Sequence, residues 1–127
     1  MPMINLIGGW LGMLAGVFSG AIIGLLFHRE DWMGGYGSYR RRLMRLGHIS
    51  FFGLGFLNLF FATTCQQLAL RGSSLAIGSW SLIAGAITMP LCCFLSAWCK
   101  PFRHLFPVPV LSVTTGILAI LIGGWKP

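Results

Sequence analysis

Four long stretches of the chain contain no charged residue, and this feature limits the possible folds more than any other. They cover residues 4–27, 46–70, 72–99 and 105–125. A helix rises about 1.5 Å per residue, so about 20 residues cross the roughly 30 Å of hydrocarbon in a bilayer. Each stretch is long enough for one crossing. The sequence therefore predicts four transmembrane helices, at about residues 4–27, 46–70, 75–98 and 110–125.

The composition supports a membrane environment. The chain is 56% hydrophobic and 9% charged, whereas soluble domains have about 25% charged residues. The apolar runs are continuous, without the alternation of a barrel strand, which favours helices. We expect an all-α integral membrane bundle of four transmembrane helices that forms one domain over residues 1–127.

The basic residues are distributed unequally between the two sides of this bundle. The connections after the first and third predicted helices contain seven of the nine, namely Arg29, Arg40, Arg41, Arg42, Arg45, Lys100 and Arg103. The opposite side has only Arg71 and Lys126. Cytoplasmic connections are enriched in Lys and Arg. We therefore expect both termini outside the cytoplasm, in a bacterial inner membrane or an equivalent membrane.

The densest basic cluster directly precedes the second apolar stretch. Arg40, Arg41, Arg42 and Arg45 are expected to anchor the chain to anionic lipid headgroups and to fix its topology. The same charges do not predict nucleic-acid binding, because no domain remains to present a groove-reading element. We expect the second helix to begin near Met44 or Leu46, with Arg41, Arg45 and His48 along one helical face that continues into the membrane.

Glycines recur at every fourth position of the first predicted helix. This glycine row, typical of a glycine zipper, consists of Gly8, Gly12, Gly16, Gly20 and Gly24. Small residues at this spacing let helix backbones approach closely in lipid. Each step of four residues overshoots a turn by about 40°, so the row winds around the helix. We expect two contacts, one within the chain and one with another subunit.

The three histidines, His28, His48 and His104, fall on the predicted cytoplasmic side. Imidazoles suit haem iron and several metal ions, and Gly55, on the face of His48, would give a flat ring room. The spacings are not diagnostic, however, and no helix carries two histidines. We predict no cofactor; a haem b or a metal ion held by His48 with His28 or His104 is the alternative. Otherwise His48 hydrogen-bonds to a neighbouring helix or a headgroup.

Other polar residues are few within the predicted helices. Asn58 falls near mid-membrane and is expected to hydrogen-bond to another helix, because an unpaired amide is costly there. In an oligomer, Asn58, Gln66 and Gln67 would be the residues to line a path for a small solute. The prolines within residues 100–109 predict a stiff, extended connection.

Catalytic groups are scarce. The two acidic residues, Glu30 and Asp31, lie in a connection and are expected to pair loosely with nearby arginines, so no predicted helix offers a carboxylate for acid–base chemistry. The sequence thus favours a non-catalytic accessory subunit of a larger membrane complex, of the respiratory or photosynthetic type. An electron-transfer protein with haem or metal and an oligomeric pore are the alternatives.

Overall fold

The structure is a computed structural model that describes residues 2–124. Its elements are α1 (Pro2–Leu26), η1 (Trp32–Gly34), α2 (Tyr39–Gln67), α3 (Ser73–Trp98), η2 (Lys100–Leu105) and α4 (Pro107–Gly124). The described residues form an all-helical fold with four long helices. Trp125, the last residue of the fourth predicted helix, and Lys126 lie outside the described residues.

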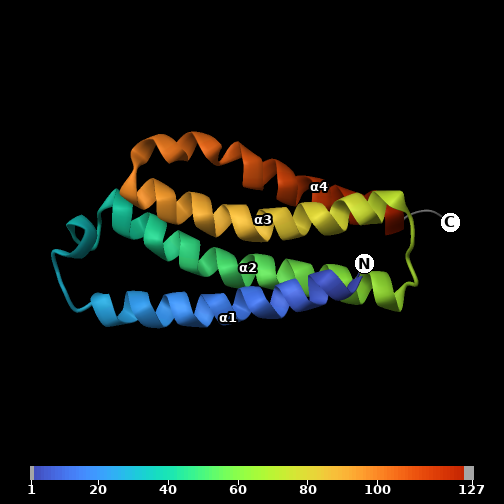
Figure 1. Cartoon of the computed structure of the whole chain (residues 1–127), viewed down its shortest axis with the longest axis horizontal. Coiled ribbons are helices and arrows are strands. Elements are labelled where there is room, and N and C mark those ends of the chain that lie inside the picture. The colour runs from blue at the N-terminus through green and yellow to red at the C-terminus, as the bar shows by residue number, and fades with distance from the viewer. Residues whose placement is uncertain (1, 125–127) are drawn as a thin grey trace.

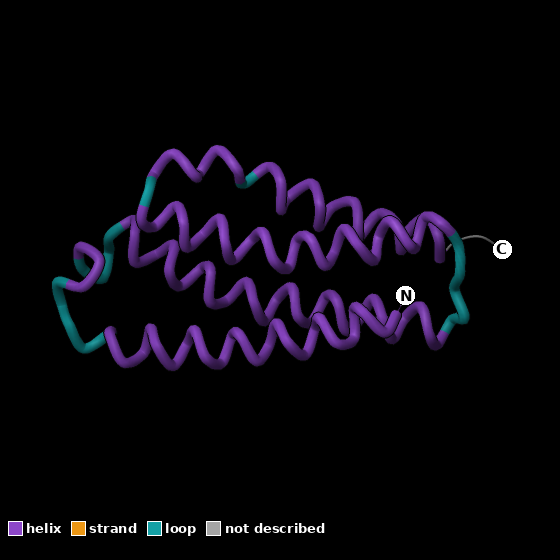
Figure 2. Tube along the Cα trace, viewed as in Figure 1, coloured by secondary structure: helices purple, strands orange, loops and turns teal. Residues whose placement is uncertain are grey.

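The four long helices lie side by side in chain order (Figure 1). The main contacts join α1 to α2, α2 to α3 and α3 to α4, and α1 also reaches α3. The α1–α2 and α3–α4 connections meet at one end of the molecule, and the α2–α3 turn lies at the other (Figure 2). We call the first the basic end and the second the turn end.

All four long helices satisfy the length and composition of a membrane span. Their outward surfaces expose large apolar side chains, including Leu14 and Phe18 of α1, Ile87 of α3 and Leu111 of α4. Such a surface is stable in hydrocarbon but not in water. These features indicate a membrane protein.

The α2 helix begins at Tyr39, earlier than the absence of charge suggests. The Ser38 hydroxyl caps it by accepting a hydrogen bond from the Arg41 backbone N–H at 3.1 Å. The uncharged stretch marks where a helix can be in hydrocarbon, not where it starts, because arginines are good helix formers outside the apolar layer. The arginine cluster therefore forms the first two turns of α2.

The connection at residues 100–109 is helical, and the prediction of an extended segment is wrong. Residues Lys100–Leu105 form a 3-10 helix with Pro101 in its first turn. The α4 helix starts at Pro107 and includes Pro109. Proline is compatible with the first turn of a helix, where its missing N–H has no intrahelical acceptor. These prolines therefore start helices.

Most of the glycine row faces α2. A Cβ built on Gly16 would lie 2.7 Å from the Phe52 ring, and one built on Gly20 would overlap the His48 ring. Beside the row, a Cβ on Gly9 would lie 2.8 Å from the Gly55 carbonyl oxygen, so the two backbones are nearly in contact there. The contact within the chain is thus the α1–α2 interface.

The two ends of the row behave differently. Gly8 lies against Ile83 of α3, and Gly24 has no neighbouring atom within 4 Å of a Cβ position. This matches the winding expected for a four-residue period, since the row turns from α3 past α2 and then away from both. The contact with another subunit stays a prediction.

The glycine contacts predict a sharp difference between two single-methyl substitutions. Gly9→Ala places a methyl group against a backbone carbonyl and should lower the free energy of unfolding by about 1–3 kcal/mol. Gly24→Ala meets open space and should leave stability unchanged or raise it by up to about 1 kcal/mol. Thermal unfolding of both variants in detergent measures the difference. Equal stabilities would contradict the close α1–α2 approach.

Candidate functional site

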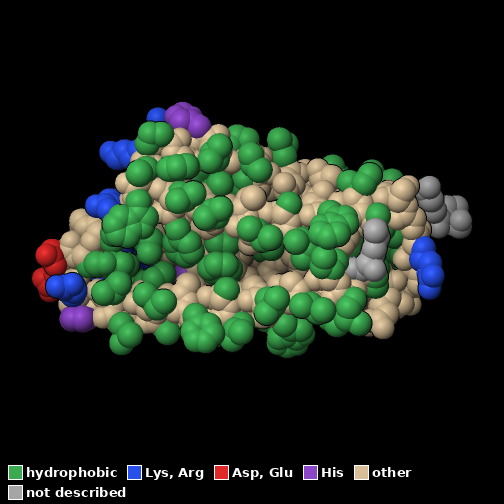
Figure 3. All heavy atoms as spheres, viewed as in Figure 1, with side chains coloured by type: hydrophobic (Ala, Val, Ile, Leu, Met, Phe, Trp, Pro, Cys, Tyr) green, Lys and Arg blue, Asp and Glu red, His purple; other side chains and the backbone are tan. Residues whose placement is uncertain are grey.

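The basic end gathers almost all the charge of the molecule. Figure 3 shows acidic, basic and histidine side chains gathered toward this end, and a separate basic group at the turn end. The fold brings the two basic connections together because α1 and α3 run in the same direction. Among the described residues, the turn end has Arg71 as its basic side chain.

Arg41 differs from the other arginines because its side chain is only 2% exposed. Its Nη2 donates to the Phe27 carbonyl oxygen at 2.8 Å, and its Nη1 contacts the Glu30 carbonyl oxygen at 3.4 Å. The guanidinium also lies 4.4 Å from the Phe27 ring centroid and 5.6 Å from those of Trp32 and Tyr36. Arg41 therefore holds the α1–α2 connection against α2 and does not face headgroups.

The acidic residues near Arg41 do not neutralise it as the sequence suggested. The contact with Glu30 uses the backbone carbonyl and not the carboxylate. Arg41 is instead stabilised by carbonyl dipoles and by cation–π contacts, which strengthen when the cation is desolvated. Arg41 is therefore not available to an external anion at this end, whereas the more exposed arginines of the cluster are.

Arg40 and Arg42 are exposed, and Arg45 is partly exposed. Arg40 donates from Nε to the Ala97 carbonyl oxygen at 2.8 Å and lies 5.5 Å from the Trp98 ring centroid. Arg45 stacks at 4.6 Å on the Tyr36 ring. Aromatic rings favour the headgroup level of a membrane. These three arginines are therefore placed where headgroups would meet them.

The histidines are separated in the structure. His28 and His104 are exposed, whereas His48 is partly buried between α1 and α2. His28 Nδ1 lies 2.7 Å from the carbonyl oxygen of Leu25, on its own helix. Within residues 2–124, no group of three His, Cys, Asp or Glu side chains is placed to hold a metal ion.

His48 has a partner on the neighbouring helix. Its Nδ1 lies 3.1 Å from the Ser19 hydroxyl, and its ring packs edge-on against Phe52 at 5.5 Å between centroids. The space expected beside Gly55 is filled, since a Cβ there would lie 3.0 Å from the Gly9 carbonyl oxygen. The free space that the sequence suggested for a flat cofactor ring beside Gly55 is therefore not present in the described residues.

The cysteines are free thiols. Cys65, Cys92 and Cys93 are buried, and Cys99 is exposed at the basic end. Cys65 lies toward the turn end and belongs to a core cluster with Phe61, Leu75 and Leu82.

The most complete polar arrangement lies inside the helices and joins Asn5, Asn58 and Ser79. We call it the asparagine network, and all three residues are fully buried. Asn5 Nδ2 donates to Asn58 Oδ1 at 2.7 Å and to the Ser79 carbonyl oxygen at 3.1 Å. The Ser79 hydroxyl donates to Asn5 Oδ1. The hydrogen bond to another helix that the sequence predicts for Asn58 is thus present.

The network closes on itself. Asn58 Nδ2 donates to the carbonyl oxygens of Leu54 at 2.9 Å and Leu82 at 3.3 Å. Every amide group of the two asparagines therefore has a partner inside the protein, as a low-dielectric interior requires. Asn58 lines no path for a solute, and Gln66 and Gln67 lie on the exposed end of α2.

Sequence reasoning missed Asn5 and Ser79 as members of this network. The sequence places Asn5 near the start of the first predicted helix. In the structure α1 begins inward of the α2–α3 turn (Figure 1), and Asn5 lies opposite Asn58, in the second half of α2. The sequence did contain one indication of this pair, because Asn5 and Asn58 each lie in a predicted transmembrane helix, where an amide needs a partner.

An apolar groove runs between α1 and α3 over a floor of α2. Its volume is about 540 Å³. We call it the α1–α3 groove, and small residues on its walls are Gly8, Gly12, Ala15 and Ala86. Phe51 of α2 and Phe94 of α3 lie toward its basic end, with ring centroids 6.1 Å apart.

Comparison with known proteins gives no relative: no protein-family model, curated protein or solved structure matches the chain. The functional interpretation therefore depends on the residues and contacts described above.

The asparagine network predicts an energetic coupling between two helices. In a double-mutant cycle, Asn5→Ala and Asn58→Ala should show a coupling energy of about 1 kcal/mol, because the two side chains share a buried hydrogen bond. The control pair is Asn5→Ala with Thr88→Ala, since the Thr88 hydroxyl bonds only within its own helix, to the Ala84 carbonyl oxygen. Unfolding in detergent measures both cycles. Additive effects in the asparagine cycle would contradict the network.

Proposed function

We propose that this chain is a non-catalytic structural subunit of a larger membrane complex, of the respiratory or photosynthetic type. The observation that carries the proposal is the α1–α3 groove, an uncovered apolar surface bordered by small residues in the middle of two spans. The polar groups of the asparagine network and of His48 are engaged in contacts between helices. The surface that the helices leave available to other molecules is therefore apolar and suited to helix packing.

The occupant that we propose for the groove is a transmembrane helix of a partner subunit. Helices associate in lipid mainly through close packing, and small residues permit a close backbone approach. The glycine row already achieves such an approach against α2, where Gly12 lies 3.7 Å from Gly55 by its Cβ position. Gly12 also borders the groove. The α1–α3 groove is therefore adjacent to the close α1–α2 interface, and its small residues would permit a partner helix to approach α1 equally closely.

For the orientation, we propose that the basic end faces the cytoplasm and that both termini face the opposite side. The meeting of two arginine- and lysine-containing connections at one end supports this, because short cytoplasmic loops are enriched in these residues. We propose a bacterial inner membrane or its equivalent as the location. Arg40, Arg42 and Arg45 would then contact anionic headgroups of the cytoplasmic leaflet, at about 1 kcal/mol each.

Cysteine labelling tests the orientation. Cys99 is exposed at the basic end, whereas the other three cysteines are buried, and peptide mass spectrometry follows the labelling of each cysteine separately. A membrane-impermeant maleimide should label Cys99 in inverted membrane vesicles, which expose the cytoplasmic face. It should not label Cys99 in spheroplasts, which expose the opposite face. The matched control is Gln67→Cys in a Cys99→Ser background, because Gln67 is exposed at the turn end. Its labelling should follow the opposite pattern, and Cys99 labelling from outside would reverse the proposed topology.

Co-purification tests the partner. From its native membrane in mild detergent, the chain should be recovered with other transmembrane subunits in fixed stoichiometry. Ala86→Trp fills the groove and should remove those subunits while the thermal stability of the chain itself changes little. The control is Ala84→Trp, since Ala84 is an exposed residue of the same helix outside the groove. Recovery of the wild-type chain as a clean monomer or homo-oligomer would refute the proposal.

A further inference from the structure

The turn end contains a second cavity that the proposed function does not use. Its volume is about 470 Å³, and we call it the turn cavity. It lies where α1 begins inward of the end of α2 (Figure 1), beside the last turns of α2 and the first turn of α3. Pro2, Phe61, Cys65, Leu75 and Arg71 are among the residues that line it.

The floor of the turn cavity is part of the apolar core. Phe61, Cys65 and Leu75 are buried at 3%, 6% and 6% exposure and form one cluster. Leu70 packs against the same cluster. A volume of this size is within the usual range of small-molecule sites, which are mostly apolar with a few placed polar groups. The floor suits an alkyl chain.

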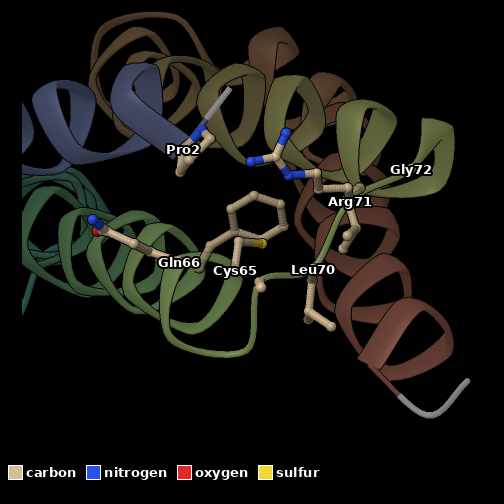
Figure 4. Close-up of a pocket in the computed structure, with 9 residues that line it drawn as sticks. Pro2, Cys65, Gln66, Leu70, Arg71 and Gly72 are labelled. Carbon is tan, nitrogen blue, oxygen red and sulfur yellow. The ribbon is translucent and has the colours of Figure 1, made fainter. Parts of the chain in front are cut away.

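The charged group at the turn cavity is the guanidinium of Arg71. Figure 4 shows its side chain extending from the α2–α3 turn toward Pro2, with the Cys65 sulfur below it and Gln66 pointing away. The two acidic residues of the sequence, Glu30 and Asp31, lie in the connection at the opposite end. No acidic side chain of the protein can therefore neutralise Arg71, and an external anion can.

The turn holds Arg71 in place. The α2 helix ends with the Leu70 N–H bonding to the Cys65 carbonyl oxygen at 2.9 Å and the Ala69 N–H to that of Gln66 at 3.3 Å. Ala69 has a left-handed φ of 50°. This is the Schellman arrangement, in which the residue after the left-handed position packs back onto the helix. Leu70 does so, and Arg71 follows directly at the edge of the cavity.

From this geometry we infer that the turn cavity binds an anionic amphiphile. The carboxylate or phosphate of the ligand pairs with Arg71, which presents a planar donor fork to such oxygens. An alkyl chain of the ligand covers Phe61 and Leu75. Both a free fatty acid and an anionic phospholipid have this chemistry. The inference concerns the isolated chain and does not depend on a partner subunit.

Protection of Cys65 tests the inference directly, because Cys65 lines the floor of the turn cavity. Delipidated full-length protein in a neutral maltoside detergent is treated with N-ethylmaleimide, and the alkylation of each cysteine is followed by peptide mass spectrometry. Three probes are compared: dodecanoate, dioctanoyl phosphatidylglycerol and dioctanoyl phosphatidylcholine. At least one anionic probe should slow alkylation of Cys65 about tenfold, without slowing that of the exposed Cys99. The anionic probe that protects identifies a fatty acid or a phospholipid as the source.

Substitutions separate charge from folding. Arg71→Gln should require about tenfold more anionic probe for the same protection, as expected for loss of a charge-assisted hydrogen bond, whereas Arg71→Lys should retain most of it. Arg42→Gln, at an exposed arginine of the opposite end, should behave as wild type. Equal protection by phosphatidylcholine, or equal protection of the wild type and Arg71→Gln at matched thermal stability, would overturn the inference.

Discussion

The hydrogen bonds of Asn5 set the relative depth of three helices. In hydrocarbon an unpaired amide is costly, and Asn5 finds all its partners at a single register of α1 against α2 and α3. Sliding α1 by one turn would break three buried hydrogen bonds at once. The apolar side chains around it select the register less strongly, because moving them from lipid to a helix surface brings no hydrophobic gain. The network therefore supplies specificity that hydrophobic packing lacks in a membrane.

Two open spaces follow from this register. With Asn5 opposite Asn58, α1 begins short of the α2–α3 turn, and the turn cavity remains beside Phe61 and Leu75. Toward the basic end, α1 stays with α2 through its glycines, and the α1–α3 groove remains above Phe51. The glycines and the asparagines thus act together: the first set the distance between α1 and α2, and the second set the depth.

The sequence predicts the elements of this fold well and their contacts only in part. Absence of charge locates four spans, because the cost of a charge in hydrocarbon leaves few exceptions. It does not locate helix ends: α2 begins at Tyr39, before its uncharged stretch and capped by Ser38, and α4 begins at Pro107, inside its own stretch. The glycine spacing indicates a packed face. Which helix fills it depends on tertiary geometry, as does the partnership of Asn5 with Ser79, 74 residues away.

The arginines show why a residue type alone does not assign a role at a membrane surface. Arg41 and Arg42 are adjacent in sequence, yet a step of about 100° around the helix turns the first toward the protein and the second outward. Burial of Arg41 is tolerable because the end of α1 presents free carbonyl groups and aromatic faces to it. Arg71 has an apolar cavity where Arg41 has carbonyl groups. An arginine therefore stabilises the α1–α2 connection at the basic end, whereas at the turn end an arginine lies at the edge of an apolar cavity.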